Sequence, residues 1–295
     1  MSIGYMGYVK LGGVMTLATN ASVNEVVAPI YSNAVHGAGW MDAGPAFYAD
    51  DVIRYEGSID FELVTDIMTF LKGWITTGRA NSKTIIISPD GSTIYTFTAG
   101  ALTGAWNSSA NFSTSEGSMA TCSCGVLGLG RTEGAGTGYI ANSAGANLYP
   151  AYKPIPYWQT EVSVVGGTGG GDPFSGSVAV DWSVDVSQNP VVVYGCTGTM
   201  GPIAVLVGEM EATANVSMFN VNGVGGIPSG ATAANTSLTI TVGTVSPVTL
   251  KLSAAIIESD GNDLSGGDAI VSRAFGFKGL SSQQGGAATA PFTMV

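Results

Sequence analysis

Apolar and polar residues alternate along much of this chain, which is the pattern of strands with one buried face. Residues 83–88 and 92–98 are rich in β-branched side chains and flank a Pro-Asp-Gly turn, so they predict a hairpin. Residues 237–242 and 248–252 predict a second hairpin of the same kind. The dominant period is therefore that of strands.

Residues 177–186 predict a further alternating strand. The side chains expected on its apolar face are Val178, Val180, Trp182, Val184 and Val186. One strong helical period occurs at 66–77, where four apolar residues follow the i, i+3, i+4, i+7 spacing: Ile67, Phe70, Leu71 and Trp74. A shorter counterpart is predicted at 215–220. We therefore expect a mainly-β fold with two tandem β-sandwich or barrel domains, each carrying one short flanking helix.

The second half of the chain repeats the order of sequence blocks in the first half. Residues 115–130 align with 265–280 at an offset of 150 (265 − 115), and 57–62 align with 208–213 at an offset of 151 (208 − 57). Such self-similarity at a fixed period indicates a duplicated unit.

A third block fixes where the two halves differ in length. Residues 20–27 align with 185–192 at an offset of 165 (185 − 20), so the first half has about 14 more residues (165 − 151) between blocks, near 37–51. Gly, Pro and Ala cluster there, as in a loop.

We accordingly predict two domains, at 1–130 and 177–295, joined by a linker or arm at 131–176. Its aromatic side chains include Tyr149, Tyr152, Tyr157 and Trp158. Aromatic rings are costly to leave in water. We expect these to pack either on a neighbouring domain, as in an ordinary connector, or on a neighbouring subunit, as an inter-subunit arm.

Charged residues are scarce. They make up 11% of the chain, against about 25% in an ordinary domain, and glycine reaches 43 of 295 residues. Mean hydropathy is +0.31. So few charges coat a monomer poorly, which predicts extensive burial against further copies of the chain.

The net charge of −11 comes from 21 acidic and 10 basic residues, and no cluster of Lys or Arg occurs. Tight nucleic-acid binding requires clustered cations, so that class is disfavoured. An acidic surface repels DNA, which suits a conduit through which DNA slides without sticking.

Cys122, Cys124 and Cys196 are an odd number without metal-site spacing, which favours folding in a reducing cytosol. The N-terminal segment lacks the pattern of a secretory signal, and no run of about 18 apolar residues occurs. Neither secretion nor membrane insertion is predicted.

Catalytic residue types are rare and isolated. His36 is the only histidine, and no nucleophile motif accompanies it. Cys122 and Cys124 would share one face of a strand, but a zinc site would also need Cys196 and His36. We predict no enzyme activity, no cofactor and no metal. The acidic segment 260–263 lacks the calcium-loop pattern and is interpreted as a turn.

Two pairs of carboxylates stand two residues apart: Asp60 with Glu62, and Glu209 with Glu211. Alternation places each pair on one face of a strand. Two interpretations remain, a solvated strand face or the acidic wall of a channel. In a glycosidase the paired carboxylates would flank a sugar cleft with aromatic platforms, and one strand alone does not make such a cleft.

The order of motifs supplies a resemblance. Each half reads as a strand, a variable loop, a Gly-x-x-acidic strand at 57–62 or 208–213, a short helix, a hairpin and a glycine-containing closing strand at 117–130 or 267–280. In this order the chain resembles the tail tube proteins, or major tail proteins, of tailed bacteriophages, over about 100 residues of each half.

The resemblance implies a virion structural protein, assembled in the host cytoplasm, whose rings stack into the tail tube through which DNA passes without tight binding. It implies rings of three duplicated chains in place of six single-domain subunits. The partners that it implies besides further copies are sheath, tape-measure, baseplate or terminator proteins. The acidic pairs would then face the lumen. Residues 1–13, 37–51 and 287–295 are candidates for contacts between rings or on the outer surface, and the alternative is that they are frayed loops and chain ends. The alternatives are a capsid or decoration protein and, less favoured, a carbohydrate-binding surface module.

Overall fold

The structure is a computed structural model. It describes residues 7–12, 14–16, 18–32, 47–75, 83–98, 106–128, 130–135, 153–165, 177–194, 202–207, 209–220, 236–263, 272–281 and 290–295.

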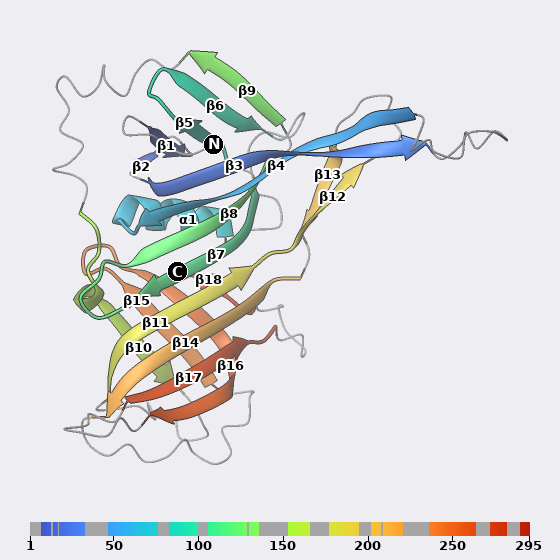
Figure 1. Cartoon of the computed structure of the whole chain (residues 1–295). Coiled ribbons are helices and arrows are strands. Elements are labelled where there is room, and N and C mark those ends of the chain that lie inside the picture. The colour runs from blue at the N-terminus through green and yellow to red at the C-terminus, as the bar shows by residue number, and fades with distance from the viewer. Residues whose placement is uncertain are drawn as a thin grey trace.

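One antiparallel sheet runs through both halves of the chain (Figure 1). Its strands, in spatial order, are β3 (Ala18–Ser32), β4 (Phe47–Glu62), β8 (Thr121–Gly128), β7 (Trp106–Thr114), β11 (Ser177–Ser187), β14 (Glu211–Asn220), β17 (Ser272–Gly279) and β16 (Val248–Asp263). The first four strands belong to the first half and the last four to the second. Because β7 pairs with β11, the halves share one continuous sheet.

Each half adds a second layer of strands. In the first half these are, in order, β2 (Val14–Thr16), β1 (Tyr8–Leu11), β5 (Ile85–Ser88), β6 (Thr93–Thr98) and β9 (Gly130–Ala135). In the second half they are β10 (Thr160–Val165), β15 (Thr236–Val242), the first part of β16 and β18 (Thr293–Met294). Strand β16 serves both layers, since residues 248–255 pair with β15 and residues 255–263 with β17.

The apolar side chains between the layers form a common core. In β15 burial alternates with period two, so that Leu238, Ile240 and Val242 are buried. The predictions of a mainly-β fold and of sandwich packing are confirmed. Both predicted hairpins are present, as β5–β6 and as β15 with the start of β16.

The predicted helix is α1 (Thr65–Ile75). Its buried side chains are Ile67, Met68, Leu71, Trp74 and Ile75. Ile67, Leu71 and Trp74 are buried as the sequence spacing indicated, whereas Phe70 is partly buried. The carbonyl of Ile75 accepts a hydrogen bond of 2.9 Å from Gln188 Nε2, so a residue of the second half satisfies the end of a helix in the first.

The helix predicted at 215–220 is wrong, because these residues belong to β14. Ala212, Ala214, Val216 and Met218 are buried in strict alternation, and β14 is paired on both sides. Period two therefore prevails over the weak helical spacing. Among the described residues, α1 is the only α-helix.

A bulge interrupts the predicted alternation of β11. Ala179 pairs with Met218 and Asp181 with Ser217, so Val180 is an extra residue. Trp182, Val184 and Val186 are buried as predicted, but Val178 falls on the other side of the bulge and is 57% exposed. A single inserted residue reverses the face of everything beyond it.

Strand pairing corrects the register of the repeat. In the first half Ser22 pairs with Ser58, which pairs with Gly125. In the second half Ser183 pairs with Asn215, which pairs with Gly276. The structural offsets are therefore 161 (183 − 22), 157 (215 − 58) and 151 (276 − 125), where the sequence blocks predict 165, 151 and 150.

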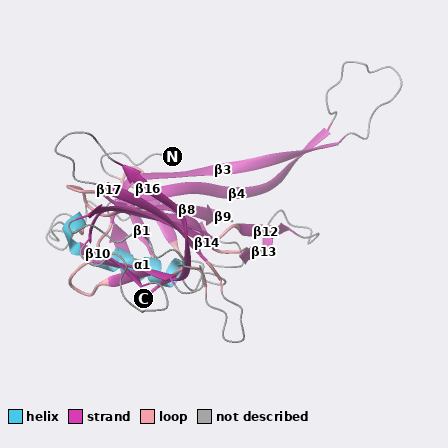
Figure 2. Cartoon of the chain, turned by 90° about the horizontal axis from the view of Figure 1, so that it is seen from below, coloured by secondary structure: helices cyan, strands magenta, loops and turns pink. Residues whose placement is uncertain are grey.

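Between the first two strands of the sheet, the structural offset changes less than the offset of the sequence blocks does. This corrects the predicted difference in length between the two halves. The first half has 4 more residues (161 − 157) between its first two strands of the sheet, and the prediction of about 14 is wrong. The second half compensates with its own hairpin, β12 (Pro190–Tyr194) and β13 (Pro202–Val207), between β11 and β14. The paired ends of β3 and β4 project far beyond the sandwich, with the shorter β12–β13 hairpin on the same side (Figure 2).

Both chain ends contribute to the fold where they are described. Strand β1 pairs with β2 and β5. At the other end Val295 exchanges two backbone hydrogen bonds with Thr249, and Phe292 is fully buried. Residues 290–295 thus pack on their own chain.

Residues 260–263, predicted as a turn, continue strand β16. The domain boundaries remain a prediction, and β9, the 3₁₀ helix η1 (Tyr157–Gln159) and β10 all contain residues of the predicted 131–176 segment.

Candidate functional site: a polar sheet face between two open edges

The large sheet has one apolar and one polar face. Ile59, Phe61, Cys122 and Cys124 point into the core, and the residues between them point away from it. Asp60 and Glu62 both lie on the polar face of β4, half-buried between neighbouring side chains.

Cross-strand pairing arranges the polar face in rows that cross the junction between the halves. One row is Asn20, Asp60, Ser123, Asn111, Asp185, Thr213 and Lys278. A second is Glu62, Thr121, Ser113, Ser183, Asn215, Gly276 and Ser259. A third is Ser22, Ser58, Gly125, Ser109, Ser187 and Glu211. The rows consist of small polar and acidic residues, with Lys278 as their basic member.

Hydrogen bonds along these rows hold the acidic groups in place. Asp60 accepts from Asn20 Nδ2 at 3.1 Å and from Ser123 Oγ at 2.5 Å. Asp185 accepts from Asn111 Nδ2 across the junction between the halves. The carboxylates are thereby fixed close to the sheet, and the face carries negative charge on short, ordered side chains.

The second acidic pair is arranged differently from the first. Glu211 opens β14 and lies in the third row, whereas Glu209 precedes the strand, and both are exposed. The structural register matches Asp60 with Ser217 (60 + 157), so the two acidic pairs are not equivalent positions of the repeat.

The sheet ends in two open edges. Strand β3 is the last strand on one side. On the other side, residues 256–263 of β16 pair with β17 but have no partner on their second edge among the described residues. In the repeat this segment corresponds to β7, and β3 corresponds to β11. The two open edges are therefore the counterparts of the two strands that pair at the junction of the halves.

A model of the phage tail tube protein family matches residues 42–293 of this chain. The chain belongs to the phage tail tube protein family. A search of curated proteins finds no match.

Family membership makes the chain a structural component of a phage tail, and the resemblance inferred from the order of motifs is confirmed. The family is one of structural proteins that assemble into a tube. No helix in the described part of the chain is long and apolar enough to cross a membrane.

The aromatic residues of the predicted arm separate into two groups. Tyr149 and Tyr152 lie outside the described residues, whereas Tyr157 and Trp158 lie in η1. Backbone hydrogen bonds fasten this stretch on both sides: Tyr157 N donates to Ser118 O at 3.0 Å, and Gly243 N donates to Gln159 O at 3.0 Å. The described stretch is thus hydrogen-bonded to its own chain on both sides, and Trp158 projects from it with 67% exposure.

Of the cysteines and the histidine considered for other chemistry, the structure describes Cys122 and Cys124, which are buried in the core. Cys122 and Cys124 share a face as predicted, with their sulfurs 3.5 Å apart in the core. Burial, with a smaller effect of Cys124, raises the pKa of the Cys122 thiol well above its usual value. His36 and Cys196 lie outside the described residues. Within the described ranges no group of three or more His, Cys, Asp or Glu residues could hold a metal.

Sequence reasoning missed the open edges and the bulge that the two halves share. Gly125 lies opposite Ser109, and Gly276 opposite Ser259, each at a register shift. A Cβ at either glycine would lie about 2.4–2.5 Å from the facing serine Oγ. The signal was a Ser–Gly pair at a nearly constant offset, which can be recognised only once pairing is known.

Proposed function

We propose that copies of this chain join edge to edge into rings, that the rings stack into the tube of a phage tail, and that genomic DNA passes along the polar face. Membership of the tail tube family supports assembly into a tube. The feature that supports this particular assembly is the junction between β7 and β11, because it has the form of a subunit contact built into one chain.

At this junction Ser109 pairs with Ser187, and Ser113 with Ser183. Ser259 is the counterpart of Ser109, and Ser22 is the counterpart of Ser183. A second copy that adds its β3 to the open edge of β16 would repeat the pairing, with Asp263 opposite Ser22 of the next copy. Such pairing removes exposed strand edges, which otherwise promote uncontrolled aggregation.

The register also supports closure into a barrel. Following direct pairs from Ser22 across four strands leads to Ser187, four residues beyond Ser183, the counterpart of Ser22. Four strands thus contribute a stagger of four residues. The stagger is therefore one residue per strand. A closed barrel of eight strands with a shear of eight has the same ratio, and its strands tilt by about 36°.

Three chains would supply 24 strands (3 × 8) to such a ring. With strands about 4.8 Å apart and tilted by about 36°, the barrel would measure about 45 Å between opposite strands. A barrel of this size encloses an aqueous channel rather than a packed core. The choice of three chains over six rests on the duplication and on the family resemblance.

The polar face would then line the channel. Its short Ser, Thr, Asn and Asp side chains present no clustered cations to bind phosphate, and its acidic groups repel DNA. Asp60, Glu62 and Glu211 would face the lumen, and Glu209 would lie at its rim. On this proposal the protein has no catalytic role and needs no cofactor.

The projecting β3–β4 and β12–β13 hairpins are candidates for contacts between stacked rings. Sheath, tape-measure, baseplate or terminator proteins would meet the tube at its surface or its ends. The reducing host cytoplasm is the proposed site of assembly.

Electron microscopy of the purified protein tests the proposal, with tubes of stacked threefold rings as the expected result. Shells would favour a capsid or decoration protein. In a Cys196→Ser background, Ser22→Cys with Asp263→Cys should form disulfides between copies, whereas Ser22→Cys alone should not.

A further inference from the structure

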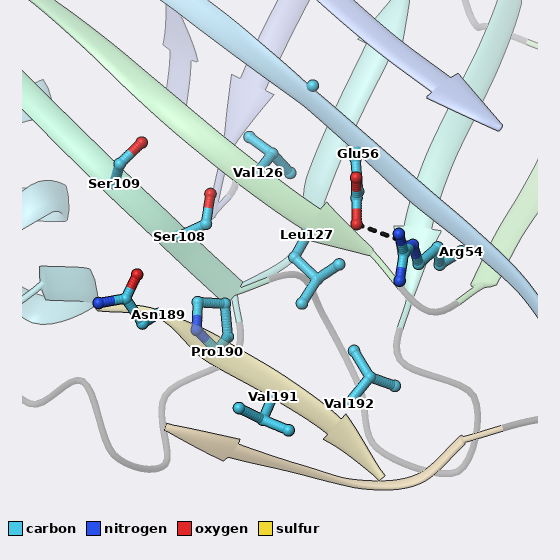
Figure 3. A pocket seen from close by; sticks show the side chains of 11 residues that line it. Arg54, Glu56, Ser108, Ser109, Val126, Leu127, Asn189, Pro190, Val191 and Val192 are labelled. Carbon is cyan, nitrogen blue, oxygen red and sulfur yellow. Dashed lines mark ion pairs between the residues drawn. The ribbon is translucent and has the colours of Figure 1, made fainter. Parts of the chain in front are cut away.

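A groove opens at the end of the polar face where the chain leaves β11. Its volume is about 590 Å³. Leu127 lies at its centre, with residues of β12 on one side and the Arg54–Glu56 ion pair, 2.8 Å between Nε and Oε1, on the other (Figure 3). The β12 residues are Pro190, Val191 and Val192, and the remaining wall comprises Gly57, Ser108, Ser109, Val126 and Asn189.

The backbone of Asn189 gives the groove its form. Its φ of 43° is a left-handed conformation that turns the chain out of β11 and brings β12 over the groove. Val191, on this wall, pairs with Leu206 of β13, and both are more than half exposed, at 56% and 59%. The groove is thus lined mainly by polar groups, with the Arg54–Glu56 pair at its edge and an apolar wall on β12.

The largest exposed apolar side chain among the described residues lies at the other end of the same strands. Trp158 is adjacent to Tyr157, which is hydrogen-bonded to the turn between β7 and β8. Met119 of that turn is 42% exposed, and Val245, two residues after Gly243, is 78% exposed. Strand β8 runs from this turn to the groove, a distance of about 20 Å. Within one chain Trp158 cannot reach the groove.

The groove and Trp158 match in chemistry. An indole ring needs apolar walls together with an acceptor for its N–H, and the groove offers Leu127, Val191 and the carboxylate of Glu56. The guanidinium of Arg54, whose side chain is 43% exposed, can lie over an indole face. Trp and Arg are the residues that most often dominate the binding energy of protein interfaces.

We propose that Trp158 of one copy inserts into this groove of a copy in the adjacent ring and so locks the rings together. The inference rests on the proposed tube, because closing the sheet into a barrel places the two ends of its strands on opposite rims. Trp158 on one rim and the groove on the other form a head-to-tail contact, which can be repeated from ring to ring without limit.

The first test compares Trp158→Ala with wild type by sedimentation and electron microscopy. Trp158→Ala should form normal rings, but the concentration needed for tubes should rise about thirtyfold. Trp158→Phe should lie between the two. The matched control is Val165→Ala, which removes a 44% exposed apolar side chain at the far end of β10 and should assemble as wild type does.

The second test is direct. In the Cys196→Ser background, Trp158→Cys with Val191→Cys should give a ladder of disulfide-linked chains in tubes, and neither single variant should. Three results would overturn the inference without contradicting the proposed function. These are tube assembly by Trp158→Ala at the wild-type concentration, loss of rings in that variant, and absence of the disulfide ladder. A wild-type protein that forms no tubes would contradict the proposed function itself.

Discussion

The two halves of the chain share the geometry of their sheet and differ in how they fill the core behind it. Both place glycine opposite serine at the same bulge, Gly125 at Ser109 and Gly276 at Ser259. Behind the sheet, Cys124 of the first half corresponds to Phe275 of the second. The first half adds the bulk of Trp74 from α1. Pairing register is thus retained in both halves, whereas the core is filled by different combinations of large and small side chains.

This contrast is what the proposed ring would require of a duplicated chain. Two successive positions of a barrel must present the same edges and the same stagger, because the closure condition depends on both. The core has only to be filled at native density, and different residues can fill it. Substitutions at positions where the two halves differ should therefore distinguish the halves most clearly.

The largest expected effect concerns a residue that joins the halves. Phe292, in the C-terminal segment, is fully buried and stacks on Phe112 of β7 with ring centroids 6.4 Å apart. Phe292→Ala should lower the free energy of unfolding by about 3–5 kcal/mol, measured by urea denaturation. Val295→Ala, at a 62% exposed site, should change it by less than about 0.5 kcal/mol. If both substitutions changed the free energy of unfolding by equally small amounts, the two halves would pack independently of each other.

Gly57 and its counterpart Ala214 provide a comparison within the repeat. A Cβ at Gly57 would lie 1.7 Å from the carbonyl oxygen of Ser22. Strand β3 therefore approaches β4 more closely than a residue with a Cβ atom at position 57 would allow. Gly57→Ala should destabilise the fold by an amount at the upper end of roughly 1–3 kcal/mol. Ala214→Gly should cost only about 0.5–1 kcal/mol, and a reversed order in thermal melts would refute the assigned register.

Gln188 provides a smaller link between the halves. It is 2% exposed and donates to the last carbonyl of α1. Gln188→Ala leaves that carbonyl without its donor and should cost about 1–2 kcal/mol in unfolding experiments. Asn189→Gly, at the adjacent left-handed position, should preserve or slightly raise stability. An unchanged stability of Gln188→Ala would argue against this link.

The hairpin turns of the two halves should differ in their response to acid. Hydrogen bonds from the backbone of Thr93 and then Ser92 lower the pKa of Asp90 from 3.8 to about 2, and the turn at 243–247 has no carboxylate. A lowered folded-state pKa favours the folded state above the unfolded pKa, and this contribution is lost as pH falls toward 2. The melting temperature of Asp90→Asn should therefore lie slightly below wild type above pH 5 and converge with it near pH 2. A constant difference across that range would contradict this assignment.

Much of the fold follows from local pattern. Residues 83–88 and 92–98 carry both the strand period and the turn chemistry, so the first hairpin was predictable. Ile67, Leu71 and Trp74 likewise predict α1. The face of Asp60 and Glu62 follows from alternation alone.

Other features depend on contacts distant in sequence. The bulge at Val180 reverses the face of Val178, and nothing in the alternating run 177–186 marks it. The register of the repeat depends on which serine faces which glycine, and aligning sequence blocks misplaced it by up to six residues (157 − 151). The open edge of β16 could not be seen because 260–263 has the composition of a turn, and tertiary pairing extends the strand through it.

In the proposed assembly the β7–β11 junction inside one chain is repeated between chains. A high-resolution electron microscopy reconstruction of assembled tubes tests it most directly. The reconstruction should show threefold rings with strands tilted by about 36°, in which β16 of each chain pairs with β3 of the next and Asp263 pairs with Ser22. Rings of six chains, or a β16 edge that pairs with anything other than β3, would contradict it.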